Sequence, residues 1–354
     1  MITDLRLQRF RSYRDASFEL SPGVNIVVGP NASGKTNLLE ALLVLARGSS
    51  YRAKDHELVE FKKDWGRLDA HLADGTQRTV KLNIGPQPAS GKQYELAGKT
   101  YKRLLLDHTL PVVLFEPEHL RLLSGGPERR RDYLDDLLEQ TITGYGTLRR
   151  KYRRTLAQRN ALLKQHGRPA QIFPWDVRLS ELAGQIVRER SRLGARLDKE
   201  LGPLYKKLSG TKIKVGLLYE TRFPAENYET RLLKELEAGL ELDLARGFTG
   251  NGPHREDLLV LFNGRPAQET ASRGEIRTAV LALKIIELKI IEAARDTTPL
   301  LLLDDVFSEL DGKRRHALTD YLAPYQTFIT TTDADTVIGH FTEKTNIIPL
   351  NTTK

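Results

Sequence analysis

The residues with the most specific chemistry form one short segment near the N-terminus, Gly29-Pro30-Asn31-Ala32-Ser33-Gly34-Lys35-Thr36. The segment fits G-x-x-x-x-G-K-[ST] at every fixed position, a match that arises by chance in roughly one chain in a hundred of this size. Its glycines let the backbone wrap so that successive N–H groups point at phosphate oxygens. Lys35 would reach the β- and γ-phosphates, and the Thr36 hydroxyl would ligate Mg²⁺. The segment predicts a nucleoside triphosphate site; the alternative is a glycine turn that merely joins a strand to a helix.

A pair of carboxylates could complete this site. Asp304 and Asp305 follow the apolar run Leu300–Leu303, and Asp304 lies 268 residues after Thr36. A carboxylate at the end of a buried strand is placed to bind the metal, and we assign that role to Asp304. Asp305 would polarise an attacking water as general base. Because aspartate is one methylene shorter than glutamate, we expect slow hydrolysis. The alternative is that both carboxylates only cap the following turn.

These residues must be positioned by strands and by one helix. The apolar run Val24–Val28 ends at Gly29, and residues 37–45 are helix formers without a breaker, which predicts a strand, a loop and a helix in that order. Strand-like runs between residues 66 and 115, with a turn at Asp74 and Gly75, predict a β-rich lobe. Further strands are expected at Val112–Phe115, 258–262, Leu300–Leu303 and Thr327–Thr331.

The middle of the chain has a helical pattern. Leu148, Tyr152 and Leu156 lie four apart, and apolar residues recur from 182 to 204 with a period of 3.5 to 4. Two opposed helices would close a short arm. At 1.5 Å per residue, the second would be roughly 35 Å long.

A serine in the last third could contact a nucleotide held by another subunit. Ser272-Arg273-Gly274-Glu275 precedes the apolar stripe of a helix, about 30 residues before the aspartates. An ABC-type ATPase places its signature here, with the serine hydroxyl and the helix end directed at a γ-phosphate on the second subunit. The alternative is an ordinary capping box, because S-x-x-E is also a helix start.

The positive charge of the chain is concentrated in its centre. The formal net charge is +9, and residues 121–220 hold 22 Lys and Arg against 11 Asp and Glu. Residues 144–175 contain eight basic side chains and no carboxylate, which favours binding of a polyanion such as DNA. The alternative is a solvated helix face. The basic residues of this stretch that we assign to DNA binding are Arg149, Arg150, Lys151, Arg153 and Arg154.

Composition and length set the remaining limits. The 354 residues allow two or three domains, the 40% hydrophobic content is typical of a folded chain, and the absence of cysteine excludes disulfide and thiolate chemistry. Charged residues occur within the first few positions of the chain, and no apolar run approaches the roughly 20 residues that span a bilayer. We therefore expect a cytoplasmic protein that does not act at a membrane.

Taken together, the motifs resemble those of the RecF family of bacterial DNA replication and repair proteins, short-armed relatives of the SMC-type ATPases. The resemblance covers almost the full chain, and its specificity comes from the order and spacing of the segments. They are Phe10-Arg11-Ser12-Tyr13, the phosphate loop continuing into Asn37-Leu38-Leu39-Glu40-Ala41, Gly126-Pro127-Glu128-Arg129-Arg130-Arg131 with Leu134-Asp135, Gly252-Pro253-His254-Arg255-Glu256-Asp257-Leu258, the Ser272 signature, and Leu302-Leu303-Asp304-Asp305-Val306-Phe307-Ser308-Glu309-Leu310-Asp311.

The resemblance implies an α/β fold, an ABC/SMC-type P-loop ATPase head with a β-rich lobe and an inserted helical arm. It implies ATP and Mg²⁺ as ligands, an ATP-dependent homodimer, weak DNA-stimulated ATP hydrolysis as a conformational switch, and binding to double-stranded and gapped DNA near single-strand to double-strand junctions. The implied partners are RecR and RecO, in the loading of RecA. Arg11 and Asn37 would contact the nucleotide, and Ser308 to Asp311 would form the D-loop across the dimer interface.

The resemblance has departures and leaves two other functions open. Glu275 stands where the family more often has glutamine, 330–332 are threonines where a transporter ATPase has its switch histidine, and the Q-loop region reads Glu116-Pro117-Glu118. The alternatives are the nucleotide-binding subunit of an ABC transporter and a DNA-binding scaffold with a vestigial P-loop. We expect the head to comprise residues 1–120 and 246–354, with the basic helical arm at 121–245.

Overall fold

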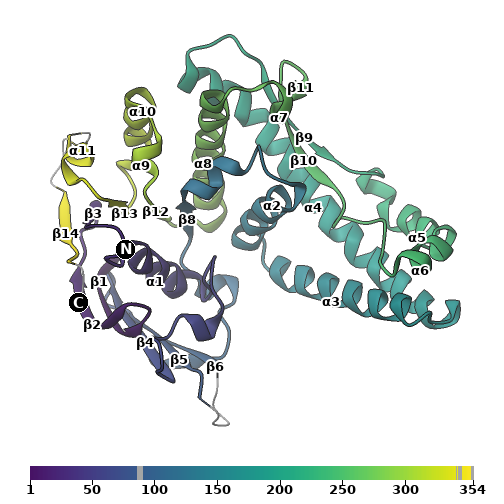
Figure 1. Ribbon diagram of the computed structural model, residues 1–354, viewed down its shortest axis with the longest axis horizontal. Coiled ribbons are helices and arrows are strands. Elements are labelled where there is room, and N and C mark those ends of the chain that lie inside the picture. Colours follow the sequence, from purple (N-terminus) through teal and green to yellow (C-terminus); the bar gives the residue numbers. More distant parts are fainter. Residues whose placement is uncertain (86–90, 340, 342–344, 352–354) are drawn as a thin grey trace. The chain divides into compact units, whose positions relative to one another are not determined.

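The computed structural model describes residues 1–85, 91–339, 341 and 345–351, and it divides the chain into two compact units (Figure 1). The first unit contains Met1–His119 and Glu287–Lys354, and the second contains Leu120–Ile286. The first boundary lies one residue from its predicted place. The second lies at 286/287, whereas the sequence predicted 245/246, because strand β10 (Asp257–Phe262) pairs with β9 (Val215–Glu220) and so packs with the insertion.

The first unit contains an antiparallel sheet that corresponds to the predicted β-rich lobe. Alternation of buried and more exposed side chains along β1 (Ile2–Phe10) and β4 (Trp65–Leu72) shows that one face packs on the core. The turn predicted at Asp74 and Gly75 joins β4 to β5 (Gln77–Asn83). The strand order is β2 (Tyr13–Glu19), β1 (Ile2–Phe10), β4 (Trp65–Leu72), β5 (Gln77–Asn83), β6 (Gly91–Leu96) and β7 (Lys99–Tyr101).

The same unit contains a five-stranded parallel sheet. Its inner strands are short and, apart from the buried Asn25 of β3, apolar or β-branched, as expected where both faces of a sheet are covered. The expected strands at Val24–Val28, Val112–Phe115, Leu300–Leu303 and Thr327–Thr331 are present with these bounds. The strand order is β14 (Asn346–Pro349), β3 (Val24–Val28), β13 (Thr327–Thr331), β12 (Leu300–Leu303) and β8 (Val112–Phe115).

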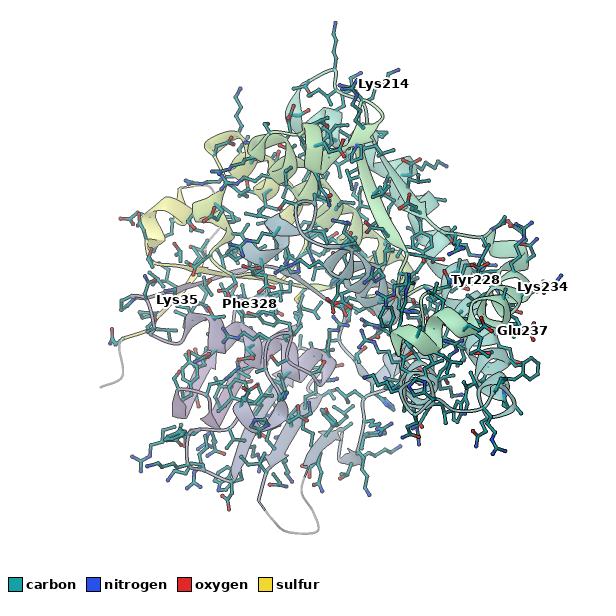
Figure 2. The ribbon with its side chains drawn as sticks, turned by 45° about the vertical axis from the view of Figure 1, so that its right-hand side comes forward. Lys35, Lys214, Tyr228, Lys234, Glu237 and Phe328 are labelled. Carbon is teal, nitrogen blue, oxygen red and sulfur yellow. The ribbon has the colours of Figure 1, made fainter. Side chains whose placement is uncertain are left out.

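Helix α1 (Lys35–Arg47) occupies the core between these two sheets (Figure 1). Its residues from Leu38 to Ala46 are all buried, so the helix is apolar around most of its circumference. Phe328 of β13, labelled in Figure 2, belongs to the same core cluster. This burial fixes the start of α1, and with it the end of the phosphate loop. The other helices of the unit are α9 (Val306–Glu309), α10 (Gly312–Leu322) and α11 (Ala334–Ile338), with 3₁₀ turns at Asp55–Glu57, Leu106–His108 and Pro117–Arg121.

The second unit is mainly helical. The two opposed helices are present as α3 (Tyr145–Lys164) and α4 (Pro169–Ser209), but α4 has 41 residues and is about 60 Å long rather than 35 Å. It begins well before the periodic run because it continues through Pro174, a residue that usually ends a helix. The remaining elements are α2 (Pro127–Thr141), α5 (Tyr228–Ala238), α6 (Leu240–Arg246), α7 (Ala267–Thr270), a 3₁₀ turn at Ala225–Asn227, and β11 (Arg265–Pro266) beside β10; α8 (Arg273–Arg295) crosses the boundary between the units.

Buried ion pairs connect the helices of the second unit. Arg159 of α3 is fully buried and donates to Asp176 of α4 and to Asp243 of α6. The pKa of Asp176 is raised, because burial of the carboxyl outweighs the charge and hydrogen bond of Arg159. Tyr228, labelled in Figure 2, donates to Glu256 in the loop before β10. Part of the basic charge of this unit therefore holds the helices together.

Candidate functional site

The predicted site residues of the first unit meet at the carboxyl edge of the parallel sheet. The phosphate loop follows β3, and Asp304 follows β12. Phe115 of β8 pairs with Leu303, and the N–H of Asp304 donates to the Phe115 carbonyl at 2.9 Å. Glu116, in the region where the sequence offered no glutamine for a Q-loop, therefore follows the strand beside Asp304. Parallel strands bring loops that are distant in sequence to a single edge, where ligands of α/β proteins bind.

The loop has the backbone geometry of a phosphate cradle. Gly34 has φ +99°, and a Cβ at this position would lie 2.9 Å from the Ser12 hydroxyl. Ala32 also has a positive φ, 66°, which is strain of the kind found at ligand sites. Ser33 is 5% exposed, and its hydroxyl has no hydrogen-bond partner within the described chain. A buried hydroxyl without a partner can donate its proton to an anionic ligand, which fits a phosphate site.

Lys35, labelled in Figure 2, lies within the loop itself. Its ammonium group donates to the carbonyls of Gly29 and Pro30 at 2.8 and 3.0 Å. The side chain is buried, so its positive charge remains inside the loop. A phosphate group could replace these carbonyls as the partner of the ammonium.

The two predicted metal ligands are in direct contact. The Thr36 hydroxyl donates to Asp304 Oδ1 at 3.1 Å, across 268 residues of sequence. A hydroxyl and a carboxylate are oxygen ligands of the kind that Mg²⁺ prefers, so the pair fits the predicted metal. This contact is the most specific agreement between the motifs and the structure.

A threonine that the sequence interpretation noted only for not being histidine contacts both Asp304 and Asp305. Thr330, at the end of β13, donates to Asp304 Oδ1 at 2.7 Å and accepts from the N–H of Asp305 at 2.8 Å. Asp305 has a left-handed backbone with φ 50°. Burial, and then the nearby charge of Asp304, raises the pKa of Asp305, while Lys35 opposes the shift. A carboxyl with a raised pKa next to a phosphate loop is suited to accept a proton.

Glu40 is a further site residue whose role the sequence did not reveal. It lies one turn after Thr36 on α1, and its side chain is fully buried. Arg11 binds both carboxylate oxygens at 2.8 and 2.9 Å, Arg52 binds one at 3.1 Å, and Ser50 donates to one at 2.5 Å. Arg11, the predicted nucleotide contact, is thus held by Glu40 in this structure. The only sequence signal for Glu40 was its place in the motif after the loop.

A groove of about 560 Å³ lies beside the loop. Arg11, Ser12 and Asn37 line one part of it, and Phe61 and Lys62 line another. Asn37 donates to the Ser12 hydroxyl at 2.9 Å and accepts from Arg52 at 2.8 Å. Phe61 is 83% exposed. The groove therefore offers polar, cationic and aromatic surface within reach of the loop.

The predicted signature lies in the second unit and has the geometry of a capping box. The N–H of Ser272 donates to the Glu275 carboxylate at 2.6 Å, and the N–H of Glu275 donates to the Ser272 hydroxyl at 3.3 Å. Arg273 begins α8, and Gly274 accepts from the Thr278 hydroxyl. Ser272 is exposed, as a contact to a second subunit requires.

The D-loop residues form local caps. Ser308 donates to the Asp305 carbonyl at 2.6 Å, and Asp311 caps α10 by accepting from the N–H of Arg314 at 3.0 Å. Both side chains are exposed. They lie immediately after the Asp305 backbone, so their position is coupled to that of the carboxylates.

The five basic residues assigned to DNA binding differ in their surroundings. Arg149 is only 12% exposed and binds Asp132, Asp135 and Glu139, so its charge is already compensated. Arg150, Lys151, Arg153 and Arg154 are exposed on α3. The composition of the segment could not reveal this difference, because the carboxylate partners of Arg149 come from α2.

In the described part of the chain, no helix is long and apolar enough to cross a membrane.

Comparison with known proteins gives matches over nearly the full chain. A family model described as RecF/RecN/SMC N terminal domain matches residues 1–348. A protein of Heliobacterium modesticaldum named DNA replication and repair protein RecF is 37% identical, over 94% of this chain and 92% of that protein. One of the same name from Lachnoclostridium phytofermentans is 32% identical, over 98% and 97%.

Solved structures give the same result. The recombination mediator protein RecF with ATPrS, of the RecFOR pathway, superposes with a TM-score of 0.88 and 30% identity, over 100% of this chain and 98% of that one. An Smc head bound to the C-winged helix domain of ScpA, 15% identical, has a TM-score of 0.52 over 96% and 92%, and shares the fold alone. The predicted ABC/SMC-type head is confirmed.

Proposed function

Because the chain belongs to the RecF family of the RecF/RecN/SMC group, we propose that it is a recombinational repair ATPase in which ATP controls dimerisation on DNA. The observation that carries this proposal is the contact between Thr36 and Asp304, next to a complete phosphate loop. The named relatives are DNA replication and repair proteins, which favours this function over a transporter subunit. The hydrogen bond between the Asp304 carboxylate and Thr36 argues against a phosphate loop that has lost its function.

The loop would bind the phosphates of ATP with its N–H groups, Lys35 and the orphan Ser33 hydroxyl. Thr36 and Asp304 would hold Mg²⁺, which supplies charge compensation at the phosphates. The nucleoside would lie in the groove that Arg11 and Asn37 line. A solved RecF structure contains ATP and superposes with a TM-score of 0.83, which supports this assignment.

Hydrolysis needs a base that is deprotonated at neutral pH and directed at the terminal phosphate. We assign this role to Asp305, whose carboxylate would accept a proton from the attacking water. The short aspartate side chain makes hydrolysis slow, as suits a switch more than a motor. Replacing Asp305 with Asn should leave ATP binding intact and reduce hydrolysis to a small residual rate.

Dimerisation would use the exposed start of α8. Ser272 of one subunit would contact the γ-phosphate bound by the other, and the Ser308 to Asp311 segment would cross the interface. ATP can favour the dimer only through better contacts in the closed state, and these contacts are lost when the γ-phosphate leaves.

DNA would be held by the exposed part of the basic stretch, Arg150, Lys151, Arg153 and Arg154, through phosphate contacts with little base readout. We leave Arg149 out of this set because three carboxylates already bind it. The preferred substrate would be gapped DNA near a single-strand to double-strand junction, where the protein would act with RecR and RecO to promote RecA loading.

The decisive experiment measures mass in solution by sedimentation, with and without ATP and DNA. The unsubstituted protein should dimerise with ATP. Lys35→Ala should bind no ATP and stay monomeric, whereas Ser272→Arg should bind ATP and stay monomeric. Ser17→Arg, an equivalent change at an exposed serine of β2, is the control and should dimerise. Dimerisation of Ser272→Arg would contradict the trans contact.

A further inference from the structure

One hydroxyl group connects the side chain of Asp304 with the backbone of Asp305. Thr330 Oγ1 donates to Asp304 Oδ1 at 2.7 Å and accepts the N–H of Asp305 at 2.8 Å. Thr330 is fully buried, and Asp304 is 7% exposed. The hydroxyl thus uses both its donor and an acceptor position on two adjacent residues of the turn that follows β12.

Neighbouring threonines of β13 have no such role. The Thr331 hydroxyl bonds the carbonyl of Asp333, and the Thr327 hydroxyl bonds the carbonyl of Tyr325, so both serve local turns. Thr330 instead bonds the side chain of Asp304 and the backbone of Asp305, in the turn after β12. A valine would have nearly the same shape in this position, so packing alone does not explain a hydroxyl here.

The bonds at Asp304 distinguish its two oxygens. Oδ1 accepts from both Thr36 and Thr330, which fills its two lone pairs. No hydrogen bond reaches Oδ2 from the described residues, so that oxygen is left for a ligand. Without Thr330, one hydroxyl at 3.1 Å would remain to fix the carboxylate, and it belongs to the other proposed metal ligand.

Thr330 also constrains Asp305. The left-handed backbone of Asp305 is uncommon for a residue other than glycine, and its N–H is tied to the Thr330 hydroxyl. The backbone carbonyl of Thr331, and not its side chain, accepts from the N–H of Gly29 at 3.3 Å, where the phosphate loop begins. The end of β13 therefore touches the loop, the Asp304 carboxylate and the Asp305 backbone.

We propose that Thr330 is a positioning residue for ATP hydrolysis, which orients Asp304 for the metal and Asp305 for water. This inference rests on the proposed function, because it assigns a role within the same site. Groups that orient metal ligands typically contribute ten- to a hundredfold to metal affinity or activity.

The test compares three variants of the full-length protein. Thr330→Val removes both hydrogen bonds and keeps the shape, Thr330→Ser restores the hydroxyl, and Thr331→Val removes the neighbouring hydroxyl as a matched control. The rate of ATP hydrolysis is measured at saturating ATP over a range of Mg²⁺ concentrations. Binding of a fluorescent ATP analogue without Mg²⁺ and the thermal midpoint are measured in parallel.

We expect Thr330→Val to reduce kcat about ten- to a hundredfold and to require more Mg²⁺ for half-maximal activity. Its metal-free nucleotide affinity should stay within about twofold of the unsubstituted protein. Thr330→Ser should recover most of kcat, and Thr331→Val should behave like the unsubstituted protein. If Thr330→Val does not yield folded protein, Thr330→Ala compared with Thr330→Ser gives the same information.

Three results would overturn the inference: an unchanged kcat and Mg²⁺ dependence in Thr330→Val, an equal defect in Thr330→Ser, or an equal defect in Thr331→Val. An unsubstituted protein that hydrolyses no ATP, alone or with DNA, would contradict the proposed function itself. The two failures are therefore distinguishable.

Discussion

Replacing Glu40 with Gln removes the negative charge that two arginines share. The side chain of Glu40 is 0% exposed, and those of Arg11 and Arg52 are 22% and 37% exposed. Glutamine keeps the volume but presents an amide NH₂ where one carboxylate oxygen accepted hydrogen bonds. In the variant, the NH₂ group of glutamine therefore faces N–H groups that also donate. The guanidinium groups of Arg11 and Arg52 lose their buried counterion.

The size of the effect follows from these contacts. Removal of one partner from a fully buried ion pair costs about 3–5 kcal/mol. Here both arginines reach water, and one glutamine oxygen still accepts, so we expect a loss of about 2–3 kcal/mol in the free energy of unfolding of the first unit. For a unit of roughly 190 residues, this corresponds to a fall of about 5–10 °C in the thermal midpoint.

The pH dependence gives an independent check. Burial by itself would raise the pKa of Glu40, but hydrogen bonds from Arg11, Arg52 and Ser50 outweigh it, so the pKa lies below its ordinary value. The stabilisation is therefore present above the unfolded pKa of about 4.3, and it is lost as pH falls through the folded pKa. The difference between the two proteins should be largest near neutral pH and should shrink in acid.

The assay is thermal unfolding followed by circular dichroism from pH 3.5 to 7.5. Asp15→Asn is the control, because Asp15 and its partner Arg6 are 48% and 53% exposed, and its midpoint should stay close to that of the unsubstituted protein. A midpoint for Glu40→Gln within 1 °C of the unsubstituted protein at pH 7 would refute the reasoning.

Three other expectations concern the loop, the base and the basic stretch. Gly34→Ala should lower ATP affinity, measured by titration, because φ at this position is +99° and the new methyl would meet two hydroxyl groups. The rate of ATP hydrolysis should fall as pH drops through the raised pKa of Asp305, and this limb should be absent in the residual activity of Asp305→Asn. Combined Lys151→Ala and Arg154→Ala substitutions should reduce the slope of log K against log salt for DNA binding by about 1.8, whereas Arg149→Ala should instead lower the thermal midpoint.

Much of the first unit could be predicted because its signals are local. The strand Val24–Val28, the loop and the start of α1 each have their own pattern. β12 is a short apolar run, and β13 is a short run of β-branched and aromatic residues. The meeting of Thr36 and Asp304 was predictable for another reason. Each follows a parallel strand, and the carboxyl ends of such strands share one edge.

What could not be predicted depends on partners distant in sequence. A count of charges treats Arg149 and Arg154 alike, yet carboxylates of α2 surround the first and leave the second exposed. Arg159 belongs to the same basic stretch and is fully buried against Asp176 and Asp243. The domain boundary at 286/287 likewise depends on the pairing of β10 with β9, and no local sequence pattern predicts that pairing.

The two interpretations of Ser272 are compatible in the structure although they were alternatives in the sequence. In the isolated subunit, Glu275 binds the Ser272 N–H, so its carboxylate occupies the positive end of α8. Such a charge at a helix N-terminus contributes about 0.3–1 kcal/mol. A γ-phosphate carries more charge and more acceptor oxygens, so it could compete for the same helix end when a second subunit presents it. If the proposed dimer forms in this way, the Glu275 carboxylate would oppose its closure, and Glu275→Gln should favour the dimer.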